Sequence, residues 1–161
     1  PEVQVVKAFL LPAAILVLAW SLKTYCDQLG TGPYIAAQLK DVLVPQVLPL
    51  LTFIVAALTA FATGTSWGTM AILLPTLGPV AHAIDGHSFG LITPMVLAAV
   101  LDGAIMGDHC SPISDTTIMS SLATGCDHVH HVRTQLPYGL LIGTWAGVLG
   151  YLGVAVLISG G

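Results

Sequence analysis

Long apolar stretches, separated by short polar segments, make up almost the whole chain. Several are close to the roughly 20 residues that an α-helix needs to cross a bilayer, and none shows the alternation of a membrane β-barrel strand. The pattern therefore predicts an all-α polytopic membrane protein. The predicted elements are a span over 3–26, a short interfacial helix over 30–40, two apolar segments within 42–84, a broken helix over 89–125 and a final span over 135–161.

Two polar strings interrupt the apolar stretches. The first, Ala62–Thr69, lies in the middle of 43 residues without a charged side chain. The second, Gly107–Thr117, contains Pro112, which stops a helix, and begins with a glycine, which loosens one. The first string is either a tight turn at the membrane surface or non-helical backbone at membrane depth, buried in protein or lining a cavity. The absence of charge and the density of hydroxyls favour the second interpretation.

The remaining polar segments predict loops. Ile84–Ser88 and Cys126–Thr134 are both expected to lie at a surface. In the final span, Gly139, Gly143 and Gly147 recur every four residues and so share one helical face. Such a face of small residues predicts close packing against another helix.

The composition agrees with a membrane protein. Charged residues are only 7% of the 161 residues, hydrophobic residues are 55%, and the mean hydropathy is +0.90. A soluble domain carries about 25% charged residues. These values exclude a disordered chain, an ordinary soluble domain and a nucleic-acid binder that depends on basic patches.

The charges are also unevenly distributed. The 92 residues from Asp41 to Val132 contain no Lys or Arg. An ionised carboxylate in apolar surroundings needs a cation or strong hydrogen-bond donors, or else it takes up a proton. Of the acids in this stretch, Asp41 and Asp85, like Asp127, are expected at the interface. The acids inside predicted spans or breaks are Asp102, Asp108 and Asp115.

The two polar strings therefore supply a candidate ion site. Carboxylates, hydroxyls and freed backbone carbonyls are the hard oxygen ligands that Na+ accepts, and an intramembrane Asp is functional by default. We predict Asp108 and Asp115 as the cation- or proton-binding carboxylates, with Asp102 as a further candidate, and expect Asp115→Asn to abolish exchange. The candidate hydroxyl ligands are Thr63, Thr65, Ser66, Ser111, Ser114, Thr116 and Thr117.

Other chemistry has weaker support in the sequence. Gly64–Gly68 matches Gly-x-Ser-x-Gly with Ser66 at its centre, but the strand and helix that this hydrolase motif requires are not expected here. His109 and Cys110 lack the spacing of zinc ligands, so no metal is expected beyond transported Na+. Three histidines between residues 128 and 131 could sense pH, although a solvated loop also explains them.

The motifs carry a resemblance. Phe61–Thr69 and Gly107–Thr117, followed by the block Asp127–Tyr138, resemble the signatures of the NhaC-type Na+/H+ antiporter family. The resemblance covers nearly the whole chain, is weakest over 1–40 and implies the C-terminal transmembrane part (1–161) of a longer antiporter. It further implies one inverted repeat in which 61–69 is the tip of a re-entrant hairpin and 107–117 is the unwound stretch of a broken helix. The two would meet near the middle of the membrane.

The resulting expectation is a secondary transporter that exchanges Na+ for H+ across the cytoplasmic membrane, without a cofactor. The resemblance leaves open an organic-acid exchanger of the malate or lactate type, and the residues leave open an intramembrane serine hydrolase or a non-transporting subunit. The expected partners are the lipid bilayer, the N-terminal part of the same chain and a possible second copy, with no nucleic acid.

Overall fold

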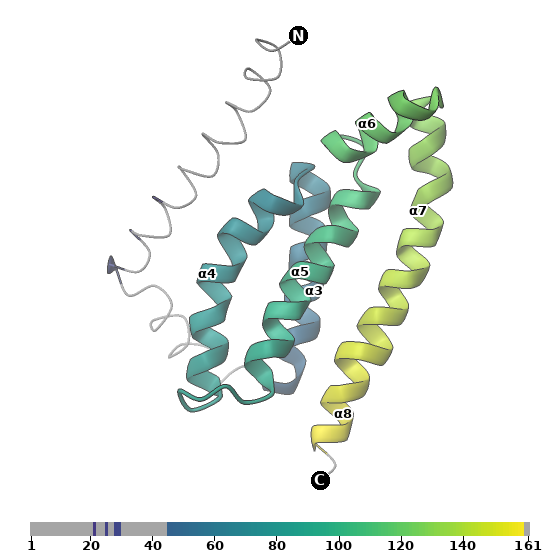
Figure 1. Ribbon diagram of the computed structural model, residues 1–161. Coiled ribbons are helices and arrows are strands. Elements are labelled where there is room, and N and C mark those ends of the chain that lie inside the picture. Colours follow the sequence, from purple (N-terminus) through teal and green to yellow (C-terminus); the bar gives the residue numbers. More distant parts are fainter. Residues whose placement is uncertain (1–20, 22–24, 26–27, 30–44, 160–161) are drawn as a thin grey trace.

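The computed structural model describes residues 21, 25, 28, 29 and 45–159 (Figure 1). The predicted span over 3–26 and the interfacial helix over 30–40 lie almost wholly outside them. Within the described residues all regular structure is helical, as predicted, and there are no strands. The elements in chain order are η1 (Pro45–Val47), α3 (Leu48–Thr63), α4 (Ser66–Ile84), α5 (Ile92–Cys110), α6 (Asp115–Thr124), α7 (His128–Trp145), η2 (Ala146–Leu152) and α8 (Gly153–Ser159).

Within the part of the chain that the structure describes, three segments are long and apolar enough to cross a membrane. They are Pro45–Thr63 and Ser66–Ile84, with 19 residues each, and His128–Val156, with 29 residues. These lengths match or exceed the roughly 20 residues that a span requires. The helical composition and these segments confirm the prediction of an α-helical membrane protein.

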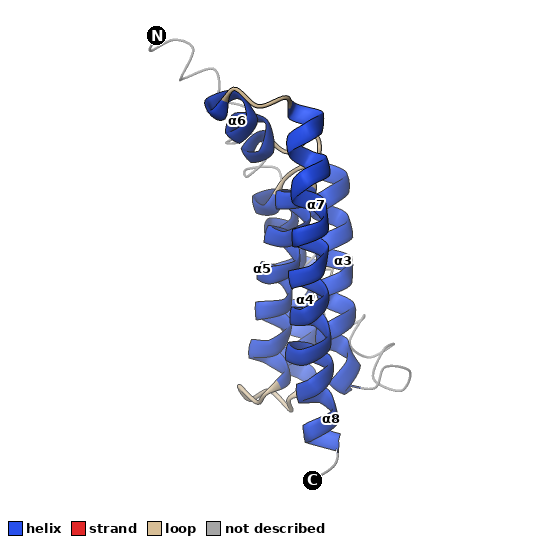
Figure 2. Ribbon diagram, turned by 90° about the vertical axis from the view of Figure 1, so that its right-hand side faces the viewer, coloured by secondary structure: helices blue, strands red, loops and turns tan. Residues whose placement is uncertain are grey.

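The helices form a bundle with one helix lying across its end. α3, α4 and α5 run side by side, and α7, η2 and α8 form one continuous rod along them (Figure 1). α6 lies at the end of the bundle where α3 joins α4 and where α5 ends, as a second view also shows (Figure 2). α5 packs most extensively against α3 and is therefore the central helix of the bundle.

Small residues allow α5 to lie close to α3. Gly103 and Gly107 are buried one turn apart on α5 and face the buried Ala56 and Ala60 of α3. A Cβ atom on Gly107 would collide with the backbone carbonyl of Ala57. This is the small-xxx-small packing of membrane helices, and it holds the C-terminal end of α5 against the end of α3.

The glycine face predicted in the final span also packs closely. A Cβ atom on Gly139 would collide with the sulfur of Cys110, and one on Gly143 with the side chain of Met106. Gly147 lies against Phe53 of α3. The prediction of close helix packing along this face is thus confirmed.

The two breaks are shorter than predicted. α3 runs to Thr63 and α4 begins at Ser66, so the first break comprises two residues. α5 continues to Cys110, so the second break covers only 111–114, and the prediction of an unwound stretch over 107–117 is wrong at both ends. Gly107 does not loosen its helix, because the packing of α5 on α3 offsets the low helix propensity of glycine. Pro112 stands just beyond the end of the helix, as predicted.

The predicted surface loop over 126–134 is wrong from residue 128 onward. The Asp127 side chain accepts a hydrogen bond of 2.8 Å from the backbone N–H of His130 and so caps α7 at His128. This acceptor satisfies a backbone donor at the start of the helix, which is why the polar sequence is helical. Further along, Ala146–Leu152 is π-helical.

Candidate ion-binding site

The two helix breaks lie against each other. Ser111, in the second break, donates a hydrogen bond of 2.8 Å from its hydroxyl to the backbone carbonyl of Phe61 in α3. Gly64 packs so closely on the second break that a Cβ atom there would lie 2.7 Å from the carbonyl oxygen of Ile113. The expected meeting of the two strings is therefore present, whereas the arrangement as a re-entrant hairpin within an inverted repeat stays a prediction.

Local capping explains the sharp turn between α3 and α4. Gly64 has a φ of +68°, in the left-handed region that glycine adopts without steric cost, and its N–H bonds the carbonyl of Ala60. The next residue, Thr65, is extended, and its hydroxyl accepts a bond of 3.2 Å from the N–H of Gly68. One residue thus ends α3 and the next caps α4, which leaves Ser66 as the first residue of α4.

Asp108 is the centre of the site. It is only 7% exposed. One carboxylate oxygen accepts a hydrogen bond of 2.9 Å from the Ser66 hydroxyl, and the other accepts one of 2.7 Å from the Ser114 hydroxyl. The hydroxyl oxygens of Ser114 and Thr116 are 2.8 Å apart. Since Ser114 has one hydroxyl proton and donates it to the carboxylate, Thr116 is the donor in this second bond.

The electrostatics of the site favour a bound cation. No Lys or Arg among the described residues contacts the Asp108 carboxylate, and its hydrogen-bond partners among these residues are Ser66 and Ser114. The carboxylate and the adjacent hydroxyls are all hard oxygen ligands. A small cation such as Na+ would therefore find oxygen ligands and an unbalanced negative charge.

The other predicted hydroxyls divide into two groups. Thr117 is buried beside the site and bonds the carbonyl of His109 at 3.4 Å. Thr63 is exposed and bonds its own helix at the carbonyl of Thr59, and Thr65 serves as the cap of α4. Of the predicted hydroxyls, Ser66 and Ser114 therefore contact the Asp108 carboxylate, and Thr116 is linked to it through Ser114. Ser111 and Thr117 bond backbone carbonyls nearby, and Thr63 and Thr65 bond within their own helices.

Asp115 is not part of this cluster. It is the first residue of α6, its side chain is exposed, and it makes no hydrogen bond to any residue that the structure describes. A carboxylate in the first turn of a helix is stabilised by the helix dipole, which gives Asp115 a structural role. Its participation in ion binding stays a prediction.

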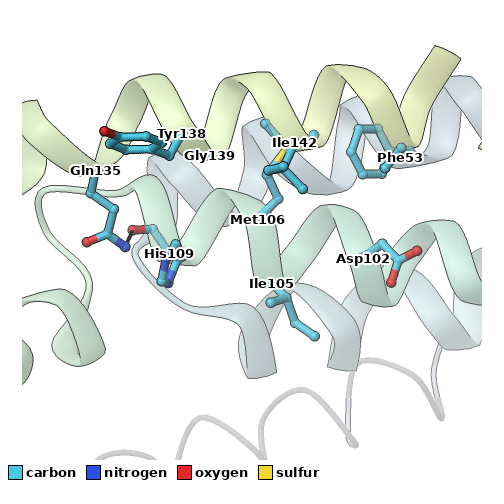
Figure 3. A pocket seen from close by; sticks show the side chains of 11 residues that line it. Phe53, Asp102, Ile105, Met106, His109, Gln135, Tyr138, Gly139 and Ile142 are labelled. Atoms are coloured by element: carbon cyan, nitrogen blue, oxygen red, sulfur yellow. Dashed lines mark hydrogen bonds between the residues drawn. The ribbon is translucent and has the colours of Figure 1, made fainter. Parts of the chain in front are cut away.

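Asp102 lies on a different side of α5 from Asp108. Its carboxylate accepts a hydrogen bond of 2.6 Å from the phenol of Tyr151 in η2. Asp102 also lines a cavity of about 580 Å³ between α5 and α7 (Figure 3). At the other end of this cavity are His109, Gln135 and Tyr138.

Sequence reasoning missed three side chains that hold this region together. Gln135 donates a bond of 3.0 Å to the carbonyl of His109. One ring nitrogen of His128 is 2.6 Å from the carbonyl of Pro112 and the other is 3.2 Å from the hydroxyl of Ser121. His128 therefore ties the second break to α6 and α7. The third is Tyr151, which bonds Asp102. The sequence signal for it was weak: Tyr151 is one of two tyrosines, with Tyr138, in the uncharged final span.

Asp85 holds the far end of α5. Its carboxylate accepts bonds from the backbone N–H groups of Thr93 (2.7 Å) and Ile92 (3.3 Å) and from the Thr93 hydroxyl (2.6 Å). Partial burial raises the pKa of Asp85, but these hydrogen bonds and the nearby His82 outweigh it, so the pKa is lowered. The residue predicted to be interfacial is thus the cap of the helix that carries Asp108.

Helix breaks that meet around a buried carboxylate without a cationic partner are features of ion-coupled membrane transporters. Residues 3–154 match the Na+/H+ antiporter family, and the chain belongs to this family. The expected membership is confirmed. The family indicates a transporter and not an enzyme; in agreement, Ser66 is the first residue of α4 and its hydroxyl donates a hydrogen bond to Asp108.

Three curated relatives are named as antiporters, with different substrates in their names. The malate-2H+/Na+-lactate antiporter of Bacillus subtilis is 40% identical over 57% of this chain and 19% of the relative. The arginine/ornithine antiporter ArcD of Halobacterium salinarum is 33% identical over 80% of this chain and 26% of the relative. The Na+/H+ antiporter NhaC of Alkalihalophilus pseudofirmus is 27% identical over 76% of this chain and 24% of the relative.

The chain spans between about a fifth and about a quarter of the length of these relatives. No solved structure matches the chain.

Proposed function

We propose that this chain contains the cation site of a secondary transporter that exchanges Na+ for H+ across the cell membrane. One observation carries the proposal: the buried Asp108 carboxylate is bonded by two hydroxyls, of Ser66 just after the first break and of Ser114 in the second, and has no cationic partner among the described residues. The family supports antiport, and the name of one relative supports Na+ and H+ as the exchanged ions.

Exchange follows from competition for one carboxylate. A proton and Na+ each neutralise the same negative charge of the Asp108 carboxylate, so the site holds one or the other. Binding of Na+ to Asp108 and its hydroxyl ligands expels this proton. If the two occupied forms are exposed in turn to opposite sides of the membrane, inward movement of one ion drives outward movement of the other.

The hydroxyls that contact Asp108 can bond the ionised carboxylate and also coordinate a bound Na+. Ser66 and Ser114 donate to the ionised carboxylate in the structure, and each retains lone pairs that can face a cation. The tight contact of Gly64 with the second break keeps these hydroxyls near the carboxylate. In the full-length antiporter, we expect the remaining helices and the lipid around the bundle to hold the Asp108 site inside the membrane.

An organic-ion exchanger is the second candidate. The cavity of about 580 Å³ beside Asp102 exceeds what a single desolvated ion needs, and it has polar side chains at both ends. Two relatives are named for organic substrates, malate and lactate in one case and arginine and ornithine in the other. An organic ion in this cavity would lie between Asp102 and Gln135.

The test uses the full-length protein in proteoliposomes that contain a pH-sensitive dye and an acidic interior. Addition of Na+ outside is expected to raise the internal pH, whereas K+ is not. A response to malate, lactate or arginine without a response to Na+ would replace the first proposal by the second. If no solute produces flux in the full-length protein, both transport proposals fail and a non-transporting subunit remains.

A further inference from the structure

A second carboxylate lies in the bundle, separate from the Asp108 cluster. Asp102 and Asp108 are six residues apart on α5, and so they point to different sides of the helix. Asp108 is bonded by the hydroxyls of Ser66 and Ser114, whereas the described partner of Asp102 is the phenol of Tyr151, 49 residues away in sequence. Each carboxylate therefore has its own donors.

The surroundings of Asp102 differ in kind from those of Asp108. Asp102 is exposed at one end of the cavity between α5 and α7, whose middle is lined by Met106 and Ile142 (Figure 3). One carboxylate and one phenol are fewer oxygen ligands than surround Asp108. This environment suits an ion that needs no coordination shell, which is a proton.

The π-helical segment positions the phenol. Tyr151 is 6% exposed, and its ring lies 5.4 Å from that of Phe53, in a stretch where the rod between α7 and α8 is π-helical. π-helical insertions occur frequently at functional sites because they re-aim side chains. Here the insertion coincides with the residue that reaches across to Asp102 on α5.

We propose that Asp102, held by Tyr151 and reached through the cavity between α5 and α7, is a second proton-binding site, distinct from the cation site at Asp108. This inference rests on the proposed Na+/H+ exchange. Asp102 takes a proton from water in the cavity and returns it to water, with no other bond made or broken. The Tyr151 hydroxyl bonds the carboxyl group in both states, since a phenol both donates and accepts.

Few other titratable groups face Asp102. His109 and Tyr138 line the same cavity, on α5 and α7, and Tyr151 contacts the carboxylate from η2. α3 contributes Phe53 to the cavity and has no titratable side chain. A pH dependence attributed to Asp102 could therefore also come from His109, Tyr138 or Tyr151. Tyr138→Phe and His109→Gln serve as controls, and Tyr151→Phe is part of the test itself.

The experiment compares the full-length wild type, Asp102→Asn and Tyr151→Phe. Saturable binding of ²²Na+ is measured in detergent, and the H+-to-Na+ ratio is measured from reversal potentials in proteoliposomes. Asp102→Asn is expected to retain Na+ binding while the ratio falls by one proton per cycle. Tyr151→Phe is expected to keep the ratio and to shift the pH at which transport is half-maximal.

Three outcomes would overturn the inference. An unchanged ratio and pH profile in both variants would make the pair purely structural. Loss of ²²Na+ binding in folded Asp102→Asn would show that Asp102 belongs to the cation site at Asp108 and is not a separate proton site. If Asp102→Asn fails to fold, an unchanged pH profile in Tyr151→Phe overturns the inference of a second proton site. Failure of the proposed function would be seen separately, as absence of Na+-driven proton flux in the wild type.

Discussion

The hydroxyl of Ser66 donates a hydrogen bond of 2.9 Å to the Asp108 carboxylate, across 42 residues of sequence. This bond joins the first residue of α4 to the last turn of α5. It also joins the two helix breaks, which the Ser111–Phe61 bond and the Gly64–Ile113 contact hold together. The proposed cation site thus lies where the two breaks meet and is not formed by either break alone.

Removal of the hydroxyls that contact Asp108 is expected to weaken Na+ binding. A hydrogen bond to a charged group contributes about 1.5–3 kcal/mol, and a tenfold change in affinity corresponds to about 1.4 kcal/mol. Ser66→Ala and Ser114→Ala are each expected to raise the Na+ concentration for half-maximal exchange about tenfold or more. Sodium titration of proton flux in proteoliposomes measures this change.

Thr63→Ala is the matched control for those variants. Thr63 is also a hydroxyl residue beside the first break, but it is exposed and bonds only its own helix. Its substitution is expected to leave the half-maximal Na+ concentration within about twofold, because surface changes cost little free energy. Equal effects of Thr63→Ala and Ser66→Ala would contradict the assignment of Ser66 to the site.

Gly64→Ala tests whether the contact between the breaks matters. The substitution strains a residue with φ of +68° and places a methyl group 2.7 Å from the carbonyl oxygen of Ile113. Gly125→Ala is an unusually close control, since Gly125 has φ of +65° but open space around it. Both variants carry the conformational cost of about 1 kcal/mol or more, and only Gly64→Ala is expected to lower Na+ affinity as well.

Thermal unfolding in detergent and Na+ titration separate the two effects. If Gly125→Ala lowers the Na+ affinity as much as Gly64→Ala, the strain in the left-handed turn is responsible and the packing of the breaks is not.

The sequence was sufficient to predict the helical membrane fold and the cluster of hydroxyls near Asp108. Charge-free apolar stretches and interrupting polar strings are properties of local sequence, and the resemblance supplied the expectation that the strings meet. The length of each break could not be predicted in this way. Gly107 is helical because Ala56 and Ala60 offer a close-packing surface, and that surface comes from a different helix.

The sequence also could not separate Asp108 from Asp115. Both lie in one polar string, but the intervening backbone directs Ser114 toward Asp108 and places Asp115 at the exposed start of α6. Side-chain direction in a non-helical segment depends on dihedral angles that residue identity does not determine. The Tyr151–Asp102 pair escaped prediction for a similar reason, because its members lie on different helices.

His128→Ala is expected to loosen the second break. The variant removes both ring contacts, to the Pro112 carbonyl and the Ser121 hydroxyl, and so frees α6 from the start of α7. Backbone amides in residues 111–127 are expected to exchange hydrogen about tenfold faster or more, for a loss of about 1.4 kcal/mol or more. Exchange followed by mass spectrometry checks this, with His130→Ala as the control because His130 is exposed and its ring makes no hydrogen bond to the residues that the structure describes. Unchanged exchange in His128→Ala would show that the contacts are dispensable.

Asp85→Ala is expected to destabilise the start of α5 in a pH-dependent way. Loss of a side-chain cap costs about 1 kcal/mol. Because the pKa of Asp85 is lowered in the folded protein, its contribution is fully present above the unfolded value near 3.9 and is lost as the pH falls through the folded value. The difference in unfolding temperature between wild type and Asp85→Ala should therefore be largest near neutral pH and shrink toward about pH 3.

Gly90→Ala supports the same test. A Cβ atom on Gly90 would lie 2.6 Å from a carboxylate oxygen of Asp85 and displace it from the cap. This variant is expected to reproduce the pH dependence of Asp85→Ala. A difference in unfolding temperature that stays constant with pH would show that the charged carboxylate is not the stabilising element.

The most direct test of the cation site is equilibrium binding of ²²Na+ to the purified full-length protein, compared among the wild type, Asp108→Asn and Asp115→Asn. The two variants remove the same charge from the same polar string, so general effects of charge cancel. Against the expectation from the sequence that both carboxylates bind the ion, we predict that Asp108→Asn abolishes saturable binding while Asp115→Asn retains it, because only Asp108 is buried and bonded by the hydroxyls of Ser66 and Ser114. Saturable binding by Asp108→Asn with wild-type affinity, or its loss in Asp115→Asn alone, would contradict this account.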